Sequence, residues 1–535
     1  MKSNFFKYIF IIFAVGIIIY AIYSIYFKKS NEEDYVPENT VEETIQIKDL
    51  RLGISNYDTI NPLLSNNKEV LNIDSLIFEP LIKITSDYNL EMCLATECSK
   101  TSGTTYVIKI DNNKKWQDGS SLIAKDIQFT IEKLKEVNSI YSYNVEKVES
   151  VEIIDSSTIK INLSEEVPFF EYNLTFPIMS NNYYLGEDFS TSTKTPIGTG
   201  MYKIESISDG NIALTKNEKW WNIKQENAKI ENINIKIYSQ VGEVYNSFKL
   251  GNIDIFATSN YDLEKYIGTI GYTKSEYKGR KFDYLAFNCE NNLLKNVEVR
   301  KAIGYALNKN SIISSAFNNN YYVSDFPLDY GNYLYETENV SSGYNQEQSK
   351  KVLQDNGWEY TNNRWQKKEN YKNLRLNLKL TVCSEDSSRV AVAQNIKEQL
   401  EQIGISVTIN KVSSNQYQTI LQNKNYEMIL TGVYNSYSPN LEGFFGNNNL
   451  QNYNNDEIKS ILTEVKNIND KNLLKEKYKR IIELYNEQLP FVSLYRNKET
   501  IIRSQKLSGE LQPNNYTTYY RFYTWSRVWF VLIIW

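Results

Sequence analysis

Polar and aromatic side chains follow the ends of two predicted strands in the second half of the chain. They are Glu385, Asp386 and Arg389 after the first strand, and Tyr434, Asn435 and Tyr437 after the second. Open α/β sheets bind ligands at the carboxyl ends of their strands. Aromatic walls with a few hydrogen-bonding groups are typical of clefts that hold small ligands. The pattern therefore predicts noncovalent binding of a small solute.

Two of these assignments have an alternative. Arg389, on the first turn of a predicted helix, pairs with a ligand carboxylate in one interpretation and lies on the surface in the other. Tyr434 and Tyr437 either line the pocket or pack between helix and sheet. The residue types alone favour neither interpretation.

Histidine is absent from all 535 residues, which removes the commonest general base and the commonest transition-metal ligand. The four cysteines, Cys93, Cys98, Cys289 and Cys383, form no CxxC pair that would hold a metal. Cys93 and Cys98 either form a disulfide or pack as small apolar residues. We therefore predict no catalytic residues, no metal site and no cofactor, and a protein that is not an enzyme.

Length and charge narrow the class of protein further. A chain of 535 residues is longer than a single hydrophobic core usually supports, so two or more lobes are expected. The net charge is -5, and Lys and Arg are spread among Asp and Glu without basic runs. Nucleic acid is therefore not an expected partner.

Alternating strand and helix patterns predict an α/β fold from about residue 44 onward. The strand candidates are Thr105–Ile110, Thr158–Leu163, Ile233–Tyr238 and Leu374–Val382. The last of these leads through an amphipathic helix, which stops at Gly404, into a second strand starting at Ile405. This segment is the clearest βαβ unit, so its two strands are expected to be parallel.

The amino terminus predicts a membrane anchor. Residues 8–27 are uncharged and predominantly apolar, and as a helix they would cross about 30 Å of hydrocarbon. A cleavable signal would have a shorter apolar core and a small-residue exit. We expect an anchor over 1–29 and an acidic spacer over 30–44. The apolar tail 528–535 is too short to cross a bilayer as a helix.

Six blocks in order resemble the peptide and nickel binding family of ABC-importer substrate-binding proteins, solute-binding protein family 5. They are Asn61–Ile84, Lys114–Lys135, Pro196–Ile207, Tyr284–Ile313, Leu353–Trp358 and Leu489–Arg496. Within them we predict a turn at Asp118–Gly119, positive φ angles at Gly198 and Gly200, and an ion pair for Arg300.

The resemblance implies a two-lobed, periplasmic-binding-protein-like fold of type II, in the large cluster with an extra subdomain in lobe I. Lobe I would comprise 45–275, with the subdomain at about 85–195, and the return 497–527; lobe II would comprise 276–496. The implied function is the extracytoplasmic, membrane-anchored component of an ABC importer. It would act as a monomer, bind peptides or similar solutes, close its lobes around them and deliver them to permease subunits.

The resemblance also assigns a role to residue 436. In dipeptide and oligopeptide binders the pattern G-W-x-x-D-Y supplies an Asp that pairs with the ligand's α-ammonium, and here Ser436 occupies that position. A neutral hydroxyl makes a weaker bond to an ammonium group than a carboxylate does. Either Glu385 or Asp386 substitutes for that Asp, or the cargo lacks a free amine.

Two other functions remain open from the sequence alone. A membrane-anchored sensor without transport coupling is compatible with the uncleaved helix and with Ser436. A hydrolase that uses carboxylates alone has ample Asp and Glu, although no spacing marks a catalytic pair.

Overall fold

The computed structural model describes residues 43–260, 262–328, 332–335, 343–369 and 371–531. The predicted membrane helix and most of the predicted spacer lie outside these ranges. In the described ranges, no helix has the length and hydropathy needed to cross a membrane. The chain divides into two compact units, the smaller formed by 1–46 with 528–535 and the larger by Ile47–Arg527. Most residues of β1 (Glu43–Ile47) and of β23 (Ser526–Val531) belong to the smaller unit, and these two strands are neighbours in one sheet.

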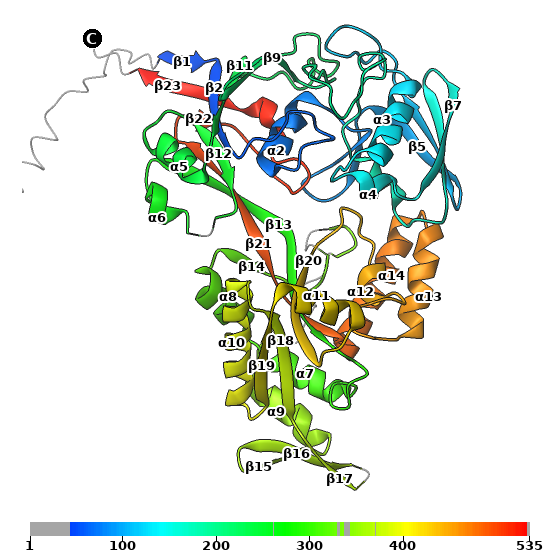
Figure 1. The fold of residues 1–535 in the computed structure, drawn as a ribbon, viewed down its shortest axis with the longest axis vertical. Coiled ribbons are helices and arrows are strands. Elements are labelled where there is room, and N and C mark those ends of the chain that lie inside the picture. Colours follow the sequence, from blue (N-terminus) through cyan, green and yellow to red (C-terminus); the bar gives the residue numbers. More distant parts are fainter. Residues whose placement is uncertain (1–42, 261, 329–331, 336–342, 370, 532–535) are drawn as a thin grey trace, which may run out of the picture. The chain divides into compact units, whose positions relative to one another are not determined.

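One mixed sheet runs through the larger unit, in the order β19-β18-β20-β13-β21-β12-β2-β11-β10-β9 (Figure 1). Its two long central strands, β13 (Tyr272–Phe287) and β21 (Phe491–Ser504), are antiparallel and pair from Tyr272 opposite Ser504 to Ala286 opposite Phe491. Different hydrophobic clusters cover their two ends. We call lobe I the part built around the buried residues of 50–277 and 501–525, and lobe II the part built around those of 282–495.

Lobe I combines its share of the sheet with a smaller sheet of order β5-β6-β8-β7. Its strands are β2 (Asp49–Ser55), β3 (Ile82–Ile84), β4 (Leu90–Met92), β5 (Ala95–Ser102), β6 (Thr105–Ile110), β7 (Val148–Asp155), β8 (Thr158–Leu163), β9 (Tyr202–Ser208), β10 (Asn211–Lys216), β11 (Asn232–Tyr238), β12 (Ile255–Thr258) and β22 (Leu507–Ser508). Its helices are α2 (Lys68–Ile77), α3 (Ala124–Glu136), α4 (Ser142–Val145), α5 (Val241–Lys249), α6 (Glu264–Ile267) and the 3₁₀ turns η1 (Phe170–Leu174) and η3 (Phe522–Thr524). The predicted strands at 105–110, 158–163 and 233–238 are confirmed.

Lobe II contains the predicted βαβ unit. Its helices are α7 (Val297–Ala306), α8 (Lys309–Phe317), α9 (Gln346–Asp355), α10 (Ser387–Gln402), α11 (Ser414–Asn423), α12 (Glu442–Phe445), α13 (Asp456–Glu464), η2 (Val465–Asn467) and α14 (Lys471–Gln488). Its strands are β14 (Tyr321–Val323), β15 (Glu359–Thr361), β16 (Arg364–Glu369), β17 (Lys372–Arg375), β18 (Asn377–Cys383), β19 (Ser406–Val412) and β20 (Met428–Tyr434). β18 and β19 are parallel, and Gly404 has a φ of +87°, as expected for a glycine that ends a helix.

The structure corrects the strand predicted at 374–382. The segment is split, with β17 pairing in a small sheet with β16 and β18 joining the large sheet. Leu376, between them, donates its N–H to the carbonyl of Trp365 and accepts from Ser406. The regular alternation of leucines predicts which side chains share one face of the strand. It does not predict that the segment changes its hydrogen-bonding partner at Leu376.

Two further local predictions were wrong for physical reasons. Gly198 and Gly200 do not have positive φ angles; a Cβ on Gly198 would lie 1.9 Å from the carbonyl oxygen of Ile77, so close backbone approach requires the glycine. Arg300 makes no ion pair within the described ranges. Its buried guanidinium donates to the carbonyls of Leu294, Lys295, Gln488 and Leu489.

The turn at Asp118–Gly119 is confirmed, since Gly119 has a φ of +91°. All four cysteines are free, and Cys93 and Cys383 are buried. The second of the two interpretations of Cys93 and Cys98, packing without a disulfide, is therefore the one that the structure records.

Candidate ligand-binding site

Two adjoining cavities lie between lobe I residues of 140–173 and, in lobe II, the end of β20 with the loop that follows it. Their volumes are ≈ 410 Å³ and ≈ 260 Å³. Both are lined by Tyr143 and Asn173 from lobe I and by Tyr434 and Ser436 from lobe II. Because residues from both lobes form the walls, a solute held here would contact both lobes at once.

The predicted residues after β20 all line these cavities. Tyr434 and Ser436 line both, Asn435 lines the smaller and Tyr437 lines the larger. Tyr434 is 75 % exposed, whereas the Tyr437 ring packs against Tyr516 with the ring centroids 4.2 Å apart. Tyr437 therefore faces the cavity and packs against a ring of the carboxyl-terminal return, and its contact with a ligand stays a prediction.

The three predicted residues after β18 lie outside these cavities. Arg389 makes a bidentate ion pair with Asp283, with Nε–Oδ2 and Nη2–Oδ1 distances of 2.8 Å and 3.0 Å. Asp386 caps α10 by accepting from the N–H of Arg389, and Glu385 accepts from the N–H of Ser414. The structure therefore uses these side chains within lobe II. The Arg389 side chain is half-buried and already has a carboxylate partner in Asp283.

Arg280, which lines the larger cavity from β13, was not among the predicted residues. Nor were the residues of the lobe I wall, which includes Ile140, Tyr141, Tyr143, Asn144, Tyr172 and Asn173. The available signal for Arg280 was its place in a β-rich run at the predicted crossing between the lobes, since solutes bind there in two-lobed proteins. No local pattern distinguished the lobe I residues.

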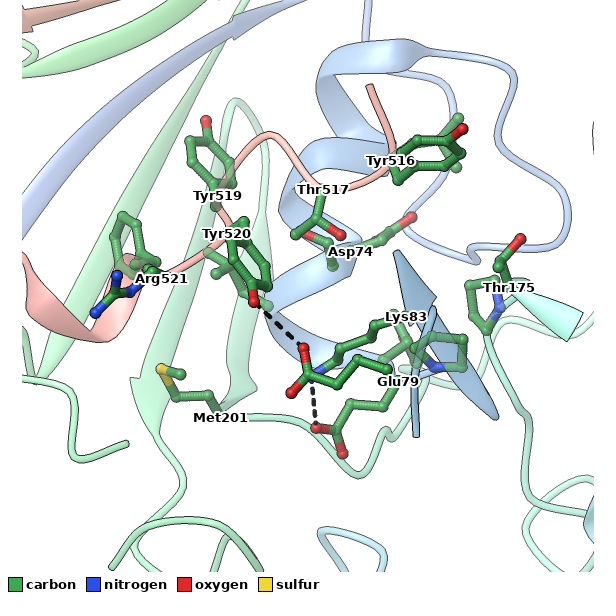
Figure 2. Close-up of a pocket in the computed structure, with 18 of the residues that line it drawn as sticks. Asp74, Glu79, Lys83, Thr175, Met201, Tyr516, Thr517, Tyr519, Tyr520 and Arg521 are labelled. Carbon is green, nitrogen blue, oxygen red and sulfur yellow. Dashed lines mark hydrogen bonds and ion pairs between the residues drawn. The ribbon is translucent and has the colours of Figure 1, made fainter. Parts of the chain in front are cut away.

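A third cavity, of ≈ 330 Å³, lies within lobe I (Figure 2). Its lining includes Asp74 from α2, Lys83 from β3, Glu91 from β4 and Tyr520 from the carboxyl-terminal return. Tyr520 donates to Glu91 at 3.2 Å. Burial, followed by the nearby Asp58, raises the pKa of Asp74 well above its usual range, and neither carboxyl oxygen of Asp74 accepts a hydrogen bond from the described residues.

Glu79 is a second buried carboxylate of lobe I, and it has many partners. Its oxygens accept from Thr199 at 2.9 Å, Trp220 at 3.2 Å and Trp221 at 2.7 Å, and Lys83 lies 3.5 Å away. Glu79 and Lys83 come from the first segment that carried the resemblance and Thr199 from the third, while Trp220 and Trp221 follow the third. The motifs therefore meet at a structural hydrogen-bond centre outside the inter-lobe cavities.

Acidic and cysteine side chains form no cluster of three or more that could hold a metal ion in the part of the chain that the structure describes. The inter-lobe cavities instead offer hydroxyl, amide and aromatic groups. Such a lining can hold an organic solute by hydrogen bonding and ring contacts.

A two-lobed α/β fold with ligand-sized cavities between its lobes defines a solute-binding protein. The family described as "Bacterial extracellular solute-binding proteins, family 5 Middle" matches residues 89–455, and the chain belongs to this family. The predicted function as the substrate-binding component of an ABC importer is thereby confirmed. This family is a class of binding proteins, not a class of enzymes.

Individual relatives are distant over nearly the whole chain. The oligopeptide-binding protein AppA of Bacillus subtilis is 24% identical over 488 residues, which cover 86% of this chain and 88% of AppA. The structure of HbpA2 from Haemophilus parasuis has a TM-score of 0.76 at 19% identity and covers 90% of this chain and 99% of its own. The unliganded open form of MppA, a periplasmic murein tripeptide binding protein, has a TM-score of 0.76 at 16% identity, with 91% and 99% covered. These likenesses confirm the two-lobed fold.

Proposed function

We propose that this chain binds peptides or similar small solutes in the two adjoining cavities between lobe I and lobe II. The observation that carries the proposal is that both cavities are lined from both lobes, by Tyr143 and Asn173 on one side and by Tyr434 and Ser436 on the other. The name of the relative AppA, an oligopeptide-binding protein, supports peptides as the cargo class. Ligand binding sites of this size commonly hold small organic molecules.

The contacts suggest how binding would be coupled to delivery. A solute that contacts both lobes binds the closed state of the protein more tightly than the open state. It stabilises the closed state by this difference in binding free energy. β13 and β21 connect the lobes and would serve as the hinge. The lobes, bounded at 275/276 and at 496/497, would close on the cargo, and the loaded monomer would dock on the permease subunits of the importer.

The location of the protein is part of the same proposal. Extracellular placement fits the description of the family, and residues 8–27 would tether the globular part to the membrane as a single helix. Residues 30–44 would form a spacer. This arrangement keeps the cavities on the side of the membrane from which solutes are taken up.

A binding experiment with a cavity-filling variant tests the cargo and the site together. The full-length chain in mild detergent is titrated calorimetrically with tri- to pentapeptides that have free or acetylated amino termini. We expect saturable binding of peptides without chemical change to them, and Ser436→Trp should weaken it at least tenfold. Ser460→Trp, on the exposed face of α13, is the control and should bind like the parent chain.

Two results would contradict the proposal. Binding that Ser436→Trp leaves unchanged would show that the cargo site lies elsewhere. Recovery of cleaved peptides would show that the protein turns its solute over, in the manner of the hydrolase alternative.

A further inference from the structure

The inter-lobe cavities carry one formal charge among the described residues that line them, and that charge is positive. Arg280 is the single Lys, Arg, Asp or Glu in the described lining of the two cavities. The remaining groups are aromatic rings, amides, hydroxyls and aliphatic side chains. Electrostatic complementarity in a partly desolvated site therefore favours a negative group on the cargo.

The backbone around Arg280 is built to bring this side chain to the cavity. The pairing of β13 with β21 shifts register between Lys278 and Phe282. Gly279 lies against Asn497, since a Cβ on it would be 2.1 Å from Asn497 Oδ1, and the same oxygen accepts from the N–H of Lys281 at 3.0 Å. Residues 279–281 of β13 lie opposite the single residue Asn497 of β21, and this irregularity brings Arg280 to the end of β20, where Lys281 pairs with Tyr434.

Two contacts then hold the guanidinium in place. Nε of Arg280 donates to the carbonyl of Asn435 at 2.8 Å, and the N–H of Asn435 donates to the carbonyl of Arg280 at 2.9 Å. The guanidinium carbon lies 3.8 Å from the centroid of the Tyr437 ring. Stacking on an aromatic ring and one hydrogen bond orient the planar group before a ligand arrives.

The charge of Arg280 is not neutralised by the described part of the protein. Some arginines have carboxylate partners within the fold, such as Arg389 with Asp283 and Arg51 with Asp254. Arg280 has no ion pair with a described Asp or Glu, and of its five N–H donors Nε alone donates to a described residue. The two terminal nitrogens are therefore available for a bidentate bond to a carboxylate.

We propose that Arg280 is the cargo-anchoring residue of the inter-lobe site and that it binds a carboxylate of the peptide. This inference rests on the proposed function. The site then selects its cargo by a negative group. This agrees with Ser436, which is neutral at the position where other peptide binders have a carboxylate for the ligand's ammonium group. The carboxylate is either the peptide's carboxyl terminus or an acidic side chain.

Calorimetric titration of the full-length chain with matched N-acetylated tetrapeptides of Ala and Tyr separates these sources. One peptide has a free carboxyl terminus, the second is its amide, and the third is an amide with one internal Glu. We expect the amide without Glu to bind at least tenfold more weakly than the free acid. Recovery of affinity by the third peptide identifies a side-chain carboxylate as sufficient.

Substitutions at Arg280 test the residue itself. Arg280→Gln should weaken binding of the free acid about 10- to 100-fold, to the level of its amide, because a charge-assisted hydrogen-bond pair is lost. Arg280→Lys should lie between the two, since it keeps the charge but not the planar fork. Arg480→Gln is the control, because Arg480 lies on α14, pairs with Glu457 at 2.7 Å and is remote from the cavity lining.

The outcomes separate this inference from the function on which it rests. Equal binding of acid and amide, or a preference for the acid that Arg280→Gln retains, overturns the role of Arg280 but leaves peptide binding intact. Failure of every peptide to bind overturns the proposed function and this inference with it. Should Arg280→Gln fail to fold, the peptide series on the parent chain decides alone.

Discussion

The cavity within lobe I and the cavities between the lobes differ in how they use charge. The lobe I cavity is lined by residues of both signs, among them Asp74, Glu79, Lys83 and Glu91. The described lining of the inter-lobe cavities holds Arg280 alone. In lobe I most of the charge is matched internally, as at Glu79, whereas Arg280 is left for a group that arrives from outside. Internally matched charge thus stabilises the fold, and unmatched charge at a lobe boundary is available for recognition.

The two buried carboxylates of lobe I sharpen this distinction. Glu79, just after the end of α2, accepts three hydrogen bonds, while Asp74, five residues earlier within α2, accepts none from the described residues. Burial of an ionised group is favourable only when partners replace its water. Glu79 and Asp74 should therefore respond to substitution in opposite directions.

Glu79→Ala should give the largest effect. Removal of the carboxylate leaves the donors of Thr199, Trp220 and Trp221 without their acceptor, and Lys83 without its counter-ion, so we expect the free energy of unfolding to fall by about 3–5 kcal/mol. Urea denaturation followed by tryptophan fluorescence measures it. Glu483→Ala, which removes an exposed partner of Arg480, should cost about 0.5 kcal/mol or less. If Glu79→Ala lowers the free energy of unfolding by less than about 1 kcal/mol, Glu79 does not have the proposed structural role.

Gly198→Ala should destabilise lobe I by about 1–3 kcal/mol, because the new Cβ would collide with the carbonyl oxygen of Ile77. Thermal unfolding of the unliganded chain provides the measurement. Gly242→Ala is the matched control, since a Cβ there meets no atom within 4 Å and the residue lies in α5. The control should be neutral or slightly stabilising. Equal melting temperatures for the two variants would refute the close-approach explanation.

Asp74→Asn should stabilise the protein by about 1–2 kcal/mol at pH 7. The pKa of Asp74 is raised in the folded state, so its contribution to stability is fully present below the unfolded pKa of about 3.9 and is lost as the pH rises toward the folded pKa. The gain from Asn should thus vanish near pH 3 and grow above pH 4. Urea midpoints across pH 3–8 test this, with the exposed Asp209→Asn as control. A gain that does not change with pH would contradict the assignment.

Ser436→Asp should produce the smallest effect, about a tenfold change in affinity. The substitution adds a carboxylate to the cavity that already holds Arg280, so peptides with free carboxylates should bind more weakly and those with free amines more tightly. Calorimetry with an acetylated acid and an amidated amine distinguishes the two changes. Weakening of both peptides alike would indicate that the variant fills space without altering charge selection.

The sequence predicted local structure better than any other part of the fold. β6 and β8 begin and end at the predicted residues, and α10 ends at Gln402, two residues before the glycine expected to stop it. The Gly198 and Arg300 predictions failed because their environments come from segments far away along the chain, the carbonyls of residue 77 and of residues 488 and 489. The two interpretations of Arg389, a ligand contact or a surface residue, stayed open for the same reason, since its partner Asp283 lies 106 residues earlier.

The sequence by itself determined the α/β class and the local elements β6, β8 and the βαβ unit around α10, because side-chain periodicity and turn residues act over a few neighbouring positions. Only the tertiary structure decided which charges are matched. Glu79 meets donors 120 to 142 residues later, and Arg280 meets Asn435 across 155 residues. Such pairings depend on how the sheet orders its strands, and one sequence carries no local signal for that order.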